Sequence, residues 1–140
     1  MNKKRVEENI GNAYDCLKES VIVKNGNEID HIYRSYISTF GASVTTGNLL
    51  AAVAFFSQDG QGDGSRSVLM KVLFDLLRKD KEAKKEPVEE ESLFAYVRAQ
   101  CKDVDSMAKT KEEILDYAVA IKLAMNLFVV KNKNTKKNKK

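Results

Sequence analysis

Apolar residues recur three or four positions apart along most of this chain, and this spacing constrains its fold more than any other feature. In residues 5–23 the steps are four, three, four and four, through Val6, Ile10, Ala13, Leu17 and Val21. Side chains at such steps share one face of an α-helix, whereas a half-buried strand alternates with a period of two. No alternating stretch of useful length is present. The pattern therefore predicts an all-α protein.

Further helices are expected wherever the same spacing continues. It recurs in 29–40, 48–56, 65–77, 93–101 and 110–128. Ser65 is expected to cap one helix, and Thr110 followed by Glu113 has the pattern of a capping box that would open the last one. The stretch 42–46, between two glycines, is read as a bend or a brief helix. Together these segments predict a compact bundle of five or six helices.

The formal charge of the chain is concentrated at its C-terminal end. The 140 residues include 24 basic and 20 acidic ones, a net charge of +4, but residues 131–140 hold six lysines and no acidic residue. The remaining residues therefore carry a net charge of −2. We expect a single helical domain at 1–130 and a basic, disordered tail at 131–140, since the tail has no apolar residue to bury.

Composition argues against several classes of protein. The longest apolar run, 49–56, is far too short to span a membrane, and no apolar stretch follows the basic N-terminus, so a cytoplasmic protein without an export signal is expected. Cys16 and Cys101 are isolated and are expected to be buried thiols. A single histidine, His31, rules out a multi-histidine metal site within one chain. No cofactor, metal or catalytic residue is predicted.

The glycine-rich loop at 59–64 invites a calcium or nucleotide interpretation. Asp59, Gln61, Asp63 and Gly64 match positions 1, 3, 5 and 6 of an EF-hand loop, but Met70 stands where a bidentate glutamate is needed. A Walker motif would require Gly-Lys followed by Ser or Thr after the glycines. An interhelical loop is the better interpretation.

Two other sets of residues are assigned to structure rather than to chemistry. His31 follows Asp30, but neighbours on a helix point in different directions, so a surface or capping histidine is expected. Four tyrosines have the helical spacing of core residues, and packing is expected for them ahead of base stacking. They are Tyr33, Tyr36, Tyr96 and Tyr117.

Basic residues within the domain offer a candidate surface for nucleic acid. Lys71 and Arg78 are seven residues apart and so share one side of their helix, and Arg66 lies near the start of that helix. Such a stripe could follow a phosphate backbone, although solvated surface charge is the simpler reading for each residue alone.

Three stretches resemble the small α-helical subunit of type III-B CRISPR–Cas effector complexes, the Cmr module that targets RNA. They are YRSYISTFGASV at 33–44, TGNLLAAVAFF at 46–56 and AVAIKLA at 118–124. The chain departs from the family pattern at Asn48, which separates Gly47 from Leu49, and at Ile121, where the family often has an aromatic residue. The family's proline before the Gly-Leu stretch is also missing.

This resemblance implies a non-catalytic subunit that stacks with copies of itself in a short filament. The filament would run beside the backbone and large subunits, and it would line the groove that holds the guide RNA–target RNA duplex. Arg34 and Lys122 fall within the family motifs, so the tentative RNA-binding set is Arg34, Arg66, Lys71, Arg78 and Lys122. The alternative is a free-standing helical nucleic-acid-binding regulator, but its recognition helix should be more polar than any segment found here.

Overall fold

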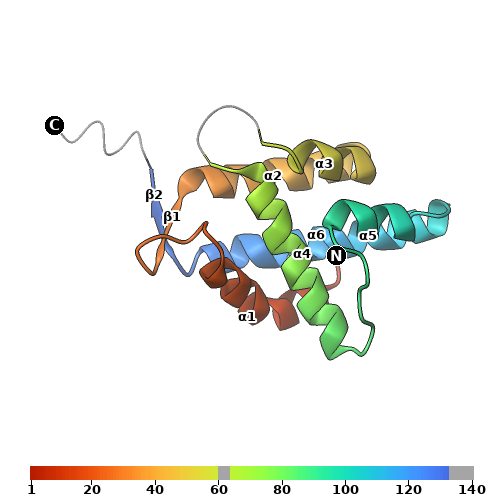
Figure 1. Ribbon diagram of the computed structural model, residues 1–140, viewed down its shortest axis with the longest axis horizontal. Helices are drawn as coiled ribbons and strands as arrows, with labels where there is room; N and C mark the ends of the chain where they lie inside the picture. Colours follow the sequence, from red (N-terminus) through yellow and green to blue (C-terminus); the bar gives the residue numbers. More distant parts are fainter. Residues whose placement is uncertain (60–63, 133–140) are drawn as a thin grey trace.

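A computed structural model of the chain describes residues 1–59 and 64–132 (Figure 1). Six helices lie within these residues, and the predicted all-α class is confirmed. They are α1 (Lys3–Glu19), α2 (His31–Thr46), α3 (Leu49–Phe56), α4 (Arg66–Ala83), α5 (Leu93–Gln100) and α6 (Val104–Met125).

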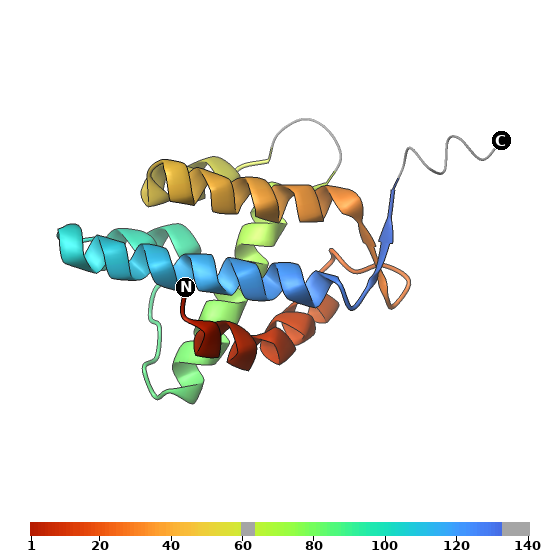
Figure 2. The same cartoon turned by 180° about the vertical axis from the view of Figure 1, so that it is seen from behind.

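The longest helix, α6, organises the bundle. Helix α1 packs along it on one side and α2 runs beside it on another. Helix α4 crosses α6 and also packs against α1 (Figures 1 and 2). The shorter helices α3 and α5 fill the end of the bundle near the start of α6. Buried side chains from all six helices form one apolar core, in which Phe40, Phe56, Leu73 and Ile114 are almost completely inaccessible to solvent.

Two short strands, which the sequence pattern did not indicate, join distant parts of the chain. Strand β1 (Glu28–Asp30) leads into α2, and β2 (Val129–Lys131) follows α6. They pair in parallel, with Glu28 opposite Val129 and Asp30 opposite Lys131. Lys131, the first residue of the predicted tail, is therefore part of this sheet, while 133–140 lie outside the described residues.

The predicted cap at Ser65 is confirmed, and a second cap, at Asp30, is found at the start of α2. The Ser65 side chain accepts from the N–H of Val68 at 3.2 Å and so caps α4. Asp30 caps α2 by accepting from the N–H of Ile32 at 2.9 Å. The stretch 42–46 simply continues α2. The first helix stops at Glu19, earlier than its predicted end, which leaves Val21 69% exposed.

The prediction that Thr110 opens the last helix is wrong. Helix α6 begins two turns earlier, at a capping box formed by Asp103 and Ser106. The Asp103 carboxylate accepts from the N–H of Ser106 at 2.8 Å, and the Ser106 hydroxyl accepts from the N–H of Asp103 at 3.0 Å. Thr110 lies inside the helix, where its hydroxyl donates to the carbonyl of Ser106.

Candidate nucleic-acid interface

The five basic residues predicted to contact RNA lie on two different surfaces. Arg66, Lys71 and Arg78 belong to α4, whereas Arg34 and Lys122 belong to α2 and α6. On α6, Tyr117 contacts α4, but Val119 and Lys122 line a groove against α2. Positions 117 and 119 point about 200° apart on a helix. The two surfaces therefore lie on opposite sides of α6, and the α2 side faces the viewer in Figure 2.

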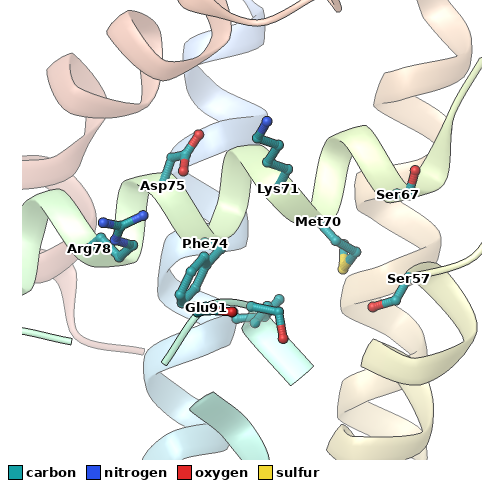
Figure 3. Close-up of a pocket in the computed structure, with 10 residues that line it drawn as sticks. Ser57, Ser67, Met70, Lys71, Phe74, Asp75, Arg78 and Glu91 are labelled. Atoms are coloured by element: carbon teal, nitrogen blue, oxygen red, sulfur yellow. The ribbon is translucent and has the colours of Figure 1, made fainter. Parts of the chain in front are cut away.

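The α4 surface is a hollow of about 280 Å³ between α4, the end of α3 and the start of α5. Lys71 and Arg78 both line it, as their spacing predicts, but Asp75 and Glu91 line it too (Figure 3). Burial raises the pKa of the Asp75 carboxyl, while Lys71 and Arg78 act to lower it. Two cations thus share the hollow with two carboxylates, and the hollow carries little net attraction for a phosphate.

Arg66 does not extend the row formed by Lys71 and Arg78. Its guanidinium carbon lies 4.4 Å from the ring centroid of Phe55, and its Nε donates to the carbonyl of Gln58 at 3.3 Å. Arg66 therefore helps to hold the end of α3 against the start of α4, and its planar group lies over the ring of Phe55, which is still 54% exposed.

The second surface is a groove of about 220 Å³ between α2 and α6. Small side chains form much of its lining, among them Ser38, Gly41, Ala42 and Ala118. Lys122 is the only charged residue among the described residues that line it. A Cβ built onto Gly41 would meet nothing within 4 Å, so the groove is open at that point.

Two further cations lie toward the ends of this groove. Helices α2 and α6 run side by side in opposite directions, so the start of α2 lies beside the end of α6 (Figure 2). Arg34 is one turn before Ser38 on the same face of α2, near Lys122. Lys111 is at the other end, where its ammonium donates to the carbonyl of Thr45 at 3.4 Å. The sequence interpretation missed Lys111, although its position, eleven residues before Lys122, places it on the same side of α6.

Other charged residues of low exposure pair with side chains of neighbouring helices and so hold α6 in place. Asp116 is 2.8 Å from the guanidinium of Arg5, and Glu113 pairs with Lys81 while accepting from the Tyr96 hydroxyl at 2.8 Å. One oxygen of Asp116, Oδ1, is buried and has no hydrogen-bond partner among residues 1–59 and 64–132. Within 1–59 and 64–132, no group of three or more His, Cys, Asp or Glu side chains is placed to hold a metal ion.

The histidine and the tyrosines occupy the positions expected of structural residues. His31 is the first residue of α2, and its Nδ1 lies 3.7 Å from the carboxylate of the capping residue Asp30. The side chains of Tyr33, Tyr96 and Tyr117 are buried, as predicted, while Tyr36 packs half-buried against the core.

The described residues of the predicted loop and the two cysteines also have structural surroundings. Asp59 accepts from Ser65 and Ser67, hydrogen bonds that lower the pKa of its carboxyl and close the connection into α4. Gln61 and Asp63 lie outside the described residues. Cys16 is buried, as predicted, which raises the pKa of its thiol to about 11, whereas Cys101, also predicted to be buried, is only half-buried.

Comparison with known families decides the identity of this bundle. Residues 5–125 match the family described as CRISPR-associated protein (Cas_Cmr5). The chain belongs to this family. The predicted resemblance is thereby confirmed, and the protein is a CRISPR-associated subunit of a Cmr complex, which it forms with other subunits. Searches of curated proteins and of solved structures gave no match.

The family match spans the α2–α6 groove and the α4 surface but ends at the last residue of α6. Strand β2 and the lysines after it lie outside the matched region. None of the helices within the described residues is long and apolar enough to cross a membrane.

Proposed function

We propose that this protein is a non-catalytic small structural subunit of a type III-B CRISPR complex that targets RNA. Copies of it stack as a short filament beside the backbone and large subunits, and the filament lines the groove that holds the guide–target RNA duplex. Membership of the Cmr5 family carries the assignment to the complex. The observation that best supports the RNA contact is the groove between α2 and α6, where Lys122 is the one charged side chain that the described residues contribute to the lining.

The α2–α6 groove suits a phosphate backbone better than the α4 hollow does. Arg34 and Lys122 are not in ion pairs with any described residue, so their charges are available to a ligand. Lys71 and Arg78 instead share their surface with Asp75 and Glu91. Lysine and arginine contacts to phosphates displace counterions without reading bases, which fits a subunit that must accept any target sequence.

Paired charge reversals distinguish the two surfaces. We expect Arg34→Glu with Lys122→Glu to weaken binding of target RNA to the assembled complex by roughly 10–100-fold at 0.1 M salt, since each lost phosphate contact removes about 0.7–0.9 from the salt slope. The matched variant, Lys71→Glu with Arg78→Glu, changes the same number of charges on α4 and should have a much smaller effect. Equal losses would instead assign RNA to both surfaces, as the sequence predicts, and no loss in either variant would refute the RNA contact.

Exposed apolar residues at the two ends of α6 support the stacking of copies. Val104 and Met107, near its first residue, are 83% and 41% exposed, and Leu127 and Val129, just after its last, are 62% and 47% exposed. The 22 residues of α6 separate these ends by about 33 Å. Two different patches at opposite ends allow a head-to-tail contact, and repeated head-to-tail contacts form a filament.

Mixing two blocked variants tests this arrangement. Val104→Asp should block one end of the subunit and Leu127→Asp the other, so neither variant alone should form oligomers or enter the complex in several copies. An equimolar mixture should form dimers that grow no further, which light scattering coupled to gel filtration would measure. Ser35→Asp, an exposed substitution on the side of α2, is the control and should assemble normally. Filaments formed by either end variant alone would contradict the head-to-tail contact.

A further inference from the structure

Lys111 lies in line with Lys122 on the side of α6 that forms the groove. The two residues are eleven positions apart, which corresponds to about three full turns of the helix and a rise of about 16 Å. Leu115 and Val119, which line the groove, lie between them on the same face. The Lys111 ammonium donates to the carbonyl of Thr45, near the end of α2, at 3.4 Å. The groove therefore has a cation toward each of its ends.

The charge of Lys111 is not offset by a neighbouring carboxylate. No ion pair with Lys111 is formed by the described residues. The positions three and four residues away on α6 hold only uncharged side chains, which are Met107, Ala108, Ile114 and Leu115. Residues 38–46, the part of α2 that forms the other side of the groove, contain no charged residue either. This end of the groove thus differs from the α4 hollow, where carboxylates stand beside the cations.

The bond to α2 leaves Lys111 able to bind an anion as well. An ammonium has three N–H donors, and the bond to the carbonyl of Thr45 uses one of them. Thr45 is itself exposed, so water can satisfy its carbonyl and the fold gains little from this bond alone. The position of Lys111 is therefore better explained by a ligand in the groove than by the packing of the two helices.

We propose that Lys111 contacts a phosphate of the RNA, and that one strand runs along the whole groove from Arg34 and Lys122 to Lys111. This inference rests on the proposed RNA contact of the groove. Phosphates of one strand of a DNA duplex are about 3.4 Å apart along its axis, so a strand that lies along about 16 Å presents several of them. Between the two ends the described lining is uncharged and includes small side chains, over which a backbone can pass (Figure 2).

Two glutamine variants of α6 test the phosphate contact. Lys111→Gln removes the charge beside the groove. Lys109→Gln is the matched control, because Lys109 points about 160° away and lines a different hollow, beside Arg5 and Lys81. Binding of target RNA to the assembled complex is measured between about 50 and 200 mM salt.

The expected loss follows from one missing phosphate contact. Such a loss lowers the salt slope by about 0.7–0.9, which corresponds to a roughly fivefold to eightfold weaker affinity at about 0.1 M salt. We expect this change for Lys111→Gln, for each copy that contacts the RNA, and no change for Lys109→Gln. Unchanged affinity and slope in Lys111→Gln, or equal losses in both variants, would overturn the proposal.

An arginine variant separates the phosphate contact from a purely structural role. Lys111→Arg keeps the positive charge and should restore the salt slope of the wild type. The melting temperature of the free Lys111→Gln subunit should stay within about 2 °C of the wild type, as for an ordinary surface substitution. A lower melting temperature with an unchanged salt slope would instead assign Lys111 to the fold and refute the phosphate contact.

A second test blocks the middle of the groove without changing any charge. Gly41 lies between Arg34 and Thr45 on α2, and a Cβ there would meet nothing within 4 Å. Gly41→Leu should leave α2 intact, because leucine is a much better helix former than glycine. We expect it to weaken binding of target RNA several-fold in complexes of unchanged composition, whereas the control Gly41→Ala should bind normally. Normal binding by Gly41→Leu would refute a strand that passes along the groove.

The paired reversal at Arg34 and Lys122 distinguishes failure of the proposed function from failure of this path. If Arg34→Glu with Lys122→Glu binds target RNA like the wild type, the RNA contact of the groove fails, and the role of Lys111 fails with it. If that variant binds weakly while Lys111→Gln and Gly41→Leu bind normally, the proposed function stands and only the path to Lys111 is refuted.

Discussion

The hydroxyl of Tyr117 is the group whose removal should most clearly reveal how α6 is held against α4. It donates to Oδ2 of Asp80 at 2.5 Å, and its residue is completely buried. Burial acts to raise the pKa of the Asp80 carboxyl, but hydrogen bonds from Tyr117, Lys84 and Asn9 outweigh it and leave the pKa below its ordinary value. Tyr117→Phe removes one of these bonds without changing the ring that fills the core.

The expected loss of stability follows from the charge and burial of this pair. A hydrogen bond to a charged group contributes about 1.5–3 kcal/mol, and Asp80 retains the ammonium of Lys84 at 3.1 Å. We therefore expect Tyr117→Phe to lower the free energy of unfolding by about 2 kcal/mol at pH 7. For a domain of this size the melting temperature should fall by roughly 6–10 °C.

The sign of the pH dependence is also determined. A carboxyl with a depressed folded-state pKa adds stability above its unfolded pKa of about 3.9, and this stability disappears as the pH falls through the folded value. The difference between wild type and Tyr117→Phe should thus be complete at pH 7 and should shrink below about pH 4.

Urea unfolding at pH 7 and at pH 3 measures both effects. Tyr14→Phe is the matched control: Tyr14 is half-buried, and no described residue forms a hydrogen bond with its hydroxyl, so its removal should change stability by less than about 0.5 kcal/mol. Asp80→Asn and the double variant complete a cycle that isolates the coupling. Equal small losses in both tyrosine variants, or a loss that persists unchanged at pH 3, would refute the reasoning.

Three further substitutions test the connections between elements. Gly64→Ala should cost at least about 2 kcal/mol by urea unfolding, because Gly64 has a φ of +81° and a Cβ there would lie 2.8 Å from Cγ2 of Ile32. Ser65→Ala should cost about 1 kcal/mol in the same assay through loss of the α4 cap. Phe128→Ala should cost about 3–5 kcal/mol and should also speed hydrogen exchange at the N–H of Val129, since the Phe128 ring stacks on Tyr14 of α1 and so anchors β2.

Helical periodicity was sufficient to predict the bundle, and it failed where the elements leave the core. The first two turns of α6 carry Val104 and Met107 on the surface, so no apolar pattern marked them and the cap at Asp103 was missed. Strands β1 and β2 have three residues each, too few to show a period, and they pair across about a hundred residues of sequence. Contacts of this kind depend on tertiary packing and leave little local signal.

The candidate site, like the fold, could be predicted from the sequence only in part. Spacing alone placed Lys71 and Arg78 on one side of α4, but the same spacing also puts Asp75 between them, and its carboxylate offsets part of their charge. Arg34 and Lys122 came from the family motifs. These two residues lie on different helices, and the groove exists only where α2 packs against α6. Helical spacing within either helix therefore could not reveal it.

The two parts of the proposed function, RNA contact and stacking of copies, both depend on residues arranged along α6. The groove runs along α6, and the exposed apolar residues lie at the two ends of that helix. If copies stack through these ends, their grooves align into one continuous track. The variants Val104→Asp and Leu127→Asp lie outside the groove and keep all of its cations. They should therefore weaken RNA binding only through the loss of neighbouring copies, and normal RNA binding by a subunit that no longer stacks would separate the two parts.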